Sequence, residues 1–139
     1  MNYKIIGKYI KDLDFSIPNT KTFFLLTKNI SNYKINIDIK SERIKQNIIE
    51  IFTTLSLTPT RNDFEKINTK IIFATIIELT NEKIEKTEIE KIVLIEVPSE
   101  IYIELRQIFV GLFKNSGFKD IKISEKVDFK KLYEMRNIQ

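Results

Sequence analysis

The side chains that most often carry out catalysis are missing from this 139-residue sequence. It contains no histidine and no cysteine, so the commonest general base, the commonest metal ligand and the thiolate nucleophile are all absent. Its three glycines, Gly7, Gly111 and Gly117, are too widely separated to form a phosphate-binding loop. Asp12 and Asp14 are a carboxylate pair, but neighbours of this kind on a strand are typical of surface charge. We therefore expect a protein that is not an enzyme and that uses no metal and no cofactor.

Length and charge narrow the class of protein further. The chain is 42% hydrophobic and 30% charged, which is typical of a single globular domain, here residues 1–139. Lys4, Lys8 and Lys11 interrupt any signal-peptide core, and no apolar run approaches the roughly 18 residues of a membrane span. We expect a cytoplasmic protein that does not insert into membranes.

The net charge of +4 and the pI near 9.2 raise the question of a nucleic-acid partner. The lysines are interleaved with acidic residues, and no run of five basic residues occurs. This interleaving argues against a nucleic-acid partner, and none is expected. A nucleic-acid-binding sheet is kept only as an alternative. What remains is binding through apolar surface.

Period-two alternation of apolar residues predicts four strands in succession. Tyr9, Leu13, Phe15 and Ile17 are expected on one face of the first strand, and the last strand is apolar on both faces, as a central or interfacial strand is. Short links between successive strands predict an antiparallel meander or a related sheet. The four predicted strands cover residues 3–17, 35–40, 47–58 and 69–79.

The segment 19–33 has no clear period, although it holds a run of large apolar residues at 23–26. Two interpretations stay open. The segment is either a loop folded onto the core or an exposed apolar wall that binds another molecule.

After the strands the pattern becomes helical, which predicts an α+β fold. A weak helix is expected within 81–97 and a last helix at 129–137, where Asp128 can cap the N-terminus. Between them, Pro98–Gly117 predicts a long helix that Ser99 caps and Gly117 closes. Its apolar arc spans about 220°, whereas packing on one sheet needs only about 100°. A second apolar surface is required, and we expect self-association to supply it.

Three stretches share their order and spacing with one known family. The first runs from Tyr9 to Phe15 as Y-I-K-D-L-D-F and closes at Pro18-Asn19. The second begins at Pro98 and includes Ile101, Tyr102 and Arg106. The third joins Gly117-Phe118 to V-D-F at 127–129 and L-Y at 132–133. Together, over about residues 8–134, they resemble the SecB family of bacterial protein-export chaperones.

The resemblance implies a SecB-like four-stranded antiparallel sheet followed by a long helix and a short C-terminal helix. It implies a homotetramer, built as a dimer of dimers, that acts as an ATP-independent holdase. Such a protein binds unfolded preproteins in apolar grooves and delivers them to the translocation ATPase SecA. By position, the client-binding residues are Phe23, Phe24, Leu26, Tyr33, Ile35 and Ile37. The expected oligomer interface consists of Ile101, Tyr102, Leu105, Arg106, Phe109 and Leu112, where a buried arginine needs a carboxylate or carbonyl partner across the interface.

One departure from the family concerns docking. The family presents acidic residues to SecA on its sheet face, and Asp12 matches one of them. Asp14 lies two residues further on the same strand face, whereas Ser16 and Thr75 stand at positions where acids are usual. The docking face is therefore reduced. The alternative is a SecB-like chaperone dedicated to one client, such as an antitoxin. Such a chaperone would explain the reduced acidic docking face better than protein export does.

Overall fold

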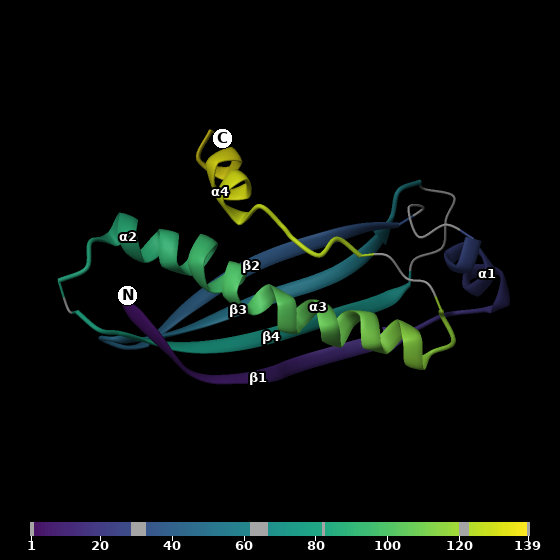
Figure 1. Cartoon of the computed structure of the whole chain (residues 1–139), viewed down its shortest axis with the longest axis horizontal. Coiled ribbons are helices and arrows are strands. Elements are labelled where there is room, and N and C mark those ends of the chain that lie inside the picture. The colour runs from purple at the N-terminus through teal and green to yellow at the C-terminus, as the bar shows by residue number, and fades with distance from the viewer. Residues whose placement is uncertain (1, 29–32, 62–66, 82, 120–122, 139) are drawn as a thin grey trace.

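The computed structural model describes residues 2–28, 33–61, 67–81, 83–119 and 123–138. Four strands form one antiparallel sheet in the order β1-β4-β3-β2 (Figure 1). The element order is β1 (Tyr3–Ser16), α1 (Thr20–Lys28), β2 (Tyr33–Lys45), β3 (Ile48–Pro59), β4 (Asn68–Leu79), α2 (Lys86–Lys91), the π-helix η2 (Ile92–Glu96), α3 (Val97–Asn115) and α4 (Phe129–Ile138). The expected α+β fold, with strands first and helices after them, is confirmed. A meander holds for β2, β3 and β4 only, because β1 pairs with β4.

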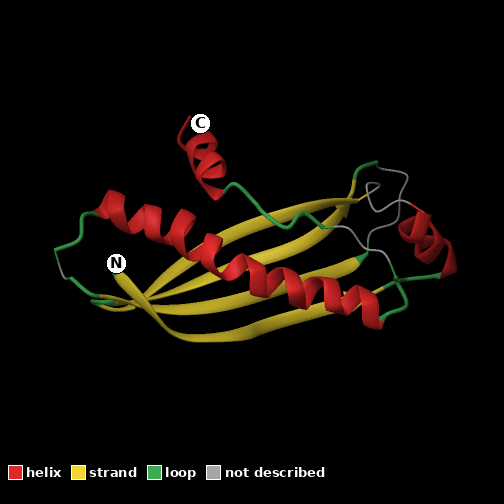
Figure 2. Ribbon diagram, viewed as in Figure 1, coloured by secondary structure: helices red, strands yellow, loops and turns green. Residues whose placement is uncertain are grey.

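The core lies between the sheet and α3, which crosses one face of the sheet (Figure 2). We call this face the inner face and the opposite one the outer face. Alternate residues of β3 are buried on the inner face, and residues four apart on α3 meet them. The buried α3 residues on this side are Ile101, Leu105, Phe109 and Phe113. Phe113 also packs edge-to-face on Phe15 of β1, with ring centroids 5.1 Å apart.

Bulges in β1 overturn the predicted alternation of that strand. Tyr9 is opposite Ala74 and Ile10 opposite Phe73, but Asp12 is then opposite Ile72, so one residue of β1 has no partner. The extra residue reverses the side on which the following side chains point. Tyr9 consequently lies on the outer face, while Leu13 and Phe15 lie on the inner face.

The prediction that the fourth strand is central is confirmed, and Ala74 shows how its outer side is covered. Ala74 is fully buried although it lies on the outer face, between Tyr9 and Phe52 in the register. The Tyr9 hydroxyl donates to Glu50 Oε2 on β3, and Lys11 Nζ lies 4.2 Å from the Phe52 ring centroid. The side chains of Tyr9 and Lys11 therefore reach from β1 across β4 to β3 and cover Ala74. The hydrogen bond to Glu50 raises the pKa of Tyr9.

The long helix does not begin where the sequence predicted. α2, η2 and α3 follow one another without a break (Figure 2), so Ser99 lies inside the helix and donates from Oγ to the Ile95 carbonyl oxygen at 2.5 Å. Pro98 has no N–H for an intrahelical bond. The wider π turn of η2 lies immediately before it, as expected where a helix accommodates such a mismatch.

The end of the helix does follow the prediction. Gly117 has a φ of 104°, and the Phe118 N–H donates to the Phe113 carbonyl oxygen at 3.0 Å, which is a Schellman closure. Asp128 Oδ1 accepts the Lys131 N–H at 3.0 Å and caps α4, also as expected.

The loop predicted for residues 19–33 is wrong for its first part, because residues 20–28 form α1. Asn19 Oδ1 accepts the Thr22 N–H at 2.9 Å and caps this helix. Thr22 and Leu26, four residues apart, are buried against the core. The second strand is longer than the predicted 35–40, since β2 runs from Tyr33 to Lys45. Residues 29–32 lie outside the described part of the chain.

Candidate functional site

A groove runs along β2, on the side of this strand that faces away from β3. Its other walls are α2, η2 and α4, and Figure 1 shows α4 beside the β2 side of the sheet. Two adjoining hollows of about 400 and 600 Å³ make up the groove. They share Ile39, Leu94, Tyr133 and Arg136. The first hollow adds Ile37, Asp38, Phe129 and Leu132, and the second adds mainly Lys40, Ser41, Lys86, Ile89, Glu90 and Val93.

The backbone of β2 makes this groove suited to an extended chain. β2 is the last strand in the sheet order and, within the described residues, pairs with β3 alone. Its other edge therefore has backbone N–H and C=O groups free of a strand partner. Ile37 and Ile39 point to the inner side of this edge strand, because they are opposite Leu55 and Thr53, which are both buried. An added strand would find backbone partners and an apolar wall together.

A smaller hollow of about 310 Å³ lies at the far end of the molecule, between α1 and the chain that leaves α3. Phe23, Phe24, Gly117 and Phe118 contribute to its lining. Phe24 is 56% exposed. Phe23 packs on Phe118 with ring centroids 4.8 Å apart. It therefore contacts the core and also lines the hollow.

The six expected client-binding residues thus fall into separate places. Leu26 and Tyr33 are buried in the core of the single chain, although Leu26 also contributes to the lining of the α1 hollow. Their part in client binding stays a prediction. Phe23 and Phe24 line the α1 hollow, and Ile37 lines the β2 groove. Ile35 is half-buried on the same strand.

The groove residues that sequence reasoning missed come from the C-terminal half of the chain. Leu94 lies in η2, and Leu132 and Tyr133 lie in α4. The helical spacing of 129, 132 and 133 was visible in the sequence. That this stripe would face β2 was not, because the position of α4 depends on the connection before it.

Four of the expected oligomer-interface residues are buried inside a single chain. Ile101, Leu105 and Phe109 face the sheet, and Tyr102 is 3% exposed. Within the single chain these four side chains present little surface to a second copy, and their place in an interface stays a prediction. Of the six residues, only Arg106 and Leu112 keep partly exposed side chains.

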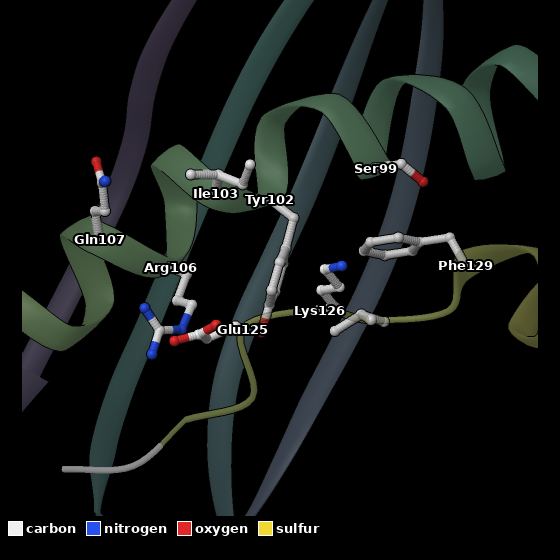
Figure 3. Close-up of a pocket in the computed structure, with 9 residues that line it drawn as sticks. Ser99, Tyr102, Ile103, Arg106, Gln107, Glu125, Lys126 and Phe129 are labelled. Carbon is white, nitrogen blue, oxygen red and sulfur yellow. The ribbon is translucent and has the colours of Figure 1, made fainter.

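Part of the second apolar surface comes from the same chain. The segment after residue 122 lies beside α3 (Figure 3), where the Tyr102 hydroxyl donates to the Ser124 carbonyl oxygen at 2.8 Å. Arg106 Nε donates to the Ile123 carbonyl oxygen at 3.0 Å. The carbonyl partner expected for Arg106 thus lies in its own chain rather than across an interface. Burial raises the pKa of Tyr102.

The pocket between α3 and this segment has a volume of about 500 Å³. Ile103, Gln107 and Lys126 are among its lining residues (Figure 3). Ile103 is 64% exposed, so one side of α3 still presents apolar surface to the surroundings.

The expected docking pair lies on the outer face of the sheet. Asp12 and Asp14 are exposed and flank Leu13, which points inward, so the two carboxylates share one face. Lys70 is opposite Asp14 in the register. Thr75 is fully buried and, opposite Ile51, faces α3. Position 75 therefore does not belong to the outer face, and an acidic residue there would not add to the docking surface.

Two further chemical questions have plain answers in the described residues. They contain no group of three or more Asp, Glu, His or Cys side chains placed to hold a metal ion. None of the described helices is both long and apolar enough to cross a membrane.

The fold is that of the SecB-like chaperones. A solved SecB-like chaperone of Mycobacterium tuberculosis, in complex with a peptide from an antitoxin, matches with a TM-score of 0.68. The match covers 91% of this chain and 88% of that one, at 8% identity, so it shows likeness of fold alone.

Sequence comparison defines the family. The family described as preprotein translocase subunit SecB matches residues 1–139. A protein of Pelagibacter ubique described as a "putative protein-export protein SecB" is 40% identical over 135 residues, covering 97% of this chain and 96% of that protein. The protein-export protein SecB of Paraburkholderia phymatum is 28% identical over 137 residues, covering 94% and 81%. The chain belongs to the SecB family of protein-export chaperones.

Proposed function

We propose that this protein is an ATP-independent holdase that binds unfolded preproteins in the cytoplasm and delivers them to SecA. The observation that carries the proposal is the groove along β2, where an open strand edge and an apolar wall lie side by side. Client side chains leave water for that wall, which is worth about 25 cal/mol per Å² of apolar area buried. Binding of this kind needs no catalytic residue and no cofactor.

We propose further that the chain acts as one domain and assembles as a homotetramer, a dimer of dimers. Several grooves on one assembly would engage different segments of the same unfolded client. The second and later contacts are then intramolecular, which raises avidity without any new chemistry. The half-exposed apolar side of α3 supports this assembly, since Ile103 is the most exposed of its large apolar side chains.

The expected result is that the purified protein suppresses aggregation of an unrelated unfolded protein without ATP. Leu132 lines the groove and is 45% exposed, and Phe24 lines the α1 hollow. Replacing both by Ser should weaken capture roughly tenfold, because about 1–2 kcal/mol of apolar contact is lost. Light scattering of the aggregating client measures this.

The matched control uses exposed apolar residues outside both hollows. Met135 is 55% exposed on the same helix as Leu132, and Ile44 is 50% exposed near the end of β2. Their double change to Ser removes similar exposed apolar area and should leave capture unchanged. Equal loss in both double variants would mean that the protein binds clients through general surface hydrophobicity and not through these hollows.

Delivery to SecA is expected to be weak and sensitive to salt. Lys11 and Lys70 lie on the same outer face as Asp12 and Asp14 and dilute the negative potential. Exposed ion pairs contribute about 1 kcal/mol or less each. Changing Asp12 and Asp14 to Asn should therefore abolish binding measured by calorimetry, whereas changing Glu125 and Glu134 to Gln should not. Tight binding that survives the first change would point to an apolar contact.

A chaperone dedicated to one client is the second candidate. Its support is the reduced acidic face, together with the fold shared with a chaperone that was solved with an antitoxin peptide. The two candidates separate on delivery: a dedicated chaperone protects its client but shows no SecA binding at any ionic strength.

A further inference from the structure

The two hollows of the β2 groove differ in charge. Three cations line the second hollow: Lys40, Lys86 and Arg136. In the described part of the chain none of the three forms an ion pair with a carboxylate. The one carboxylate in the same lining is Glu90, which accepts a long hydrogen bond of 3.4 Å from the Tyr133 hydroxyl. This end of the groove therefore has an excess of positive charge.

The first hollow is close to neutral. Arg136 is shared with the second hollow, and Asp38 balances it. The remaining side chains are apolar or aromatic, with Ile37, Phe129 and Leu132 prominent. The groove thus has an apolar end near Ile37 and a cationic end near Ser41.

The strand sets the distance between these ends. Ile37 and Ser41 are four residues apart on β2, which corresponds to about 13 Å at roughly 3.3 Å per residue. A client segment paired with β2 as a strand would have the same rise per residue. A side chain in the apolar end and another in the cationic end would then be about four residues apart in the client.

We propose that the groove selects extended client segments in which large apolar residues and carboxylates are spaced about four residues apart. This inference rests on the proposed holdase function and names the class of segment that the same groove prefers. The apolar part supplies the affinity, and the carboxylates supply the direction in which the segment lies. A segment with lysines in place of the carboxylates would meet three like charges there.

Net charge alone could attract an acidic peptide, because the protein carries +4. Spacing distinguishes the two effects, so the test uses three labelled peptides with the same apolar residues. The first has two Asp residues spaced four positions away from the apolar residues. The second has the same two Asp residues within the apolar run, and the third has Asn in place of Asp. Fluorescence anisotropy at low salt gives the Kd of each.

The protein variants are matched in charge. The groove variant carries Lys40→Gln, Lys86→Gln and Arg136→Gln, and the control variant carries Lys21→Gln, Lys70→Gln and Lys114→Gln at exposed positions outside the groove. We expect the unmodified protein to bind the spaced Asp peptide roughly tenfold more tightly than the Asn peptide, the effect of about two exposed ion pairs. The ratio should fall to about one in the groove variant and persist in the control. It should also shrink at about 0.5 M salt.

The quantity compared is a ratio within each protein, so any general loss of binding in a variant cancels. Equal Kd values for the spaced and embedded Asp peptides, or the same ratio in both triple variants, would overturn the selectivity. Peptide binding that persists in that case would leave the holdase proposal standing. Absence of binding by all three peptides would overturn both.

Discussion

Replacing Phe109 by Asp is expected to unfold the protein rather than to dissociate an assembly. Phe109 is fully buried between α3 and the sheet, and its ring packs against Phe113 with centroids 5.4 Å apart. Truncating a buried phenylalanine to Ala alone costs about 3–5 kcal/mol. A carboxylate in the same place adds the cost of an unpaired buried charge. The sum is comparable to the whole stability of a small domain, about 5–15 kcal/mol.

Circular dichroism and urea unfolding check this prediction. The Asp variant should lack a cooperative unfolding transition, and Phe109→Leu should retain one at a lower urea midpoint. A Phe109→Asp protein that unfolds at the midpoint of the unmodified chain would show that this side chain is not in the core.

Much of the fold could be predicted because its signals are local. Alternation in β3 and β4 and the Asp128 and Gly117 caps depend on neighbouring residues, and each appears where the pattern indicated. The face of Tyr9 could not be predicted, since a bulge is decided by pairing with a distant strand. The helix at 20–28 has a short apolar face of three or four residues, too few for its period to stand out.

The candidate site could be predicted only in part, for a different reason. Ile37 was named through the resemblance to the SecB family, and alternation indicated only that it shares a strand face with Ile35 and Ile39. Leu94 and Leu132 join it only because α2, η2 and α4 pass beside that edge, which is a matter of tertiary packing. The arc of the long helix was read correctly as too wide for one sheet. From the sequence, a second copy of the chain was expected to cover all of the apolar surface that the sheet leaves open. Residues 123–129 of the same chain cover part of it, at Tyr102.

Ile103 is the residue on which the assembly prediction now depends. With Tyr102 covered, the large apolar side chains of α3 that keep exposed area are Ile103 and, in part, Ile108 and Leu112. At 100° per residue Ile108 and Leu112 lie about 140° and 180° around the helix from Ile103, so Ile103 stands apart from the other two. Apart from its chain neighbours and the backbone of its own helix, no heavy atom of the described residues lies within 4 Å of the place a Cβ would occupy at Gly111. Gly111 lies between Ile103 and Ile108 around the helix axis, so a second helix could approach closely there, beside Ile103.

Ile103→Asp is expected to convert the proposed tetramer to smaller species without loss of the fold. Ile103 is 64% exposed in the single chain, so the substitution is tolerated there, whereas a charge without a partner at a helix–helix contact costs several kcal/mol. Multi-angle light scattering should show a mass of four chains for the unmodified protein and of one or two for the variant, with identical circular dichroism. Ile44→Asp, at a 50% exposed position near the end of β2, is the control and should keep four chains. A stable monomer in the unmodified protein, or a tetramer in the Ile103 variant, would mean that α3 has no second surface to bury.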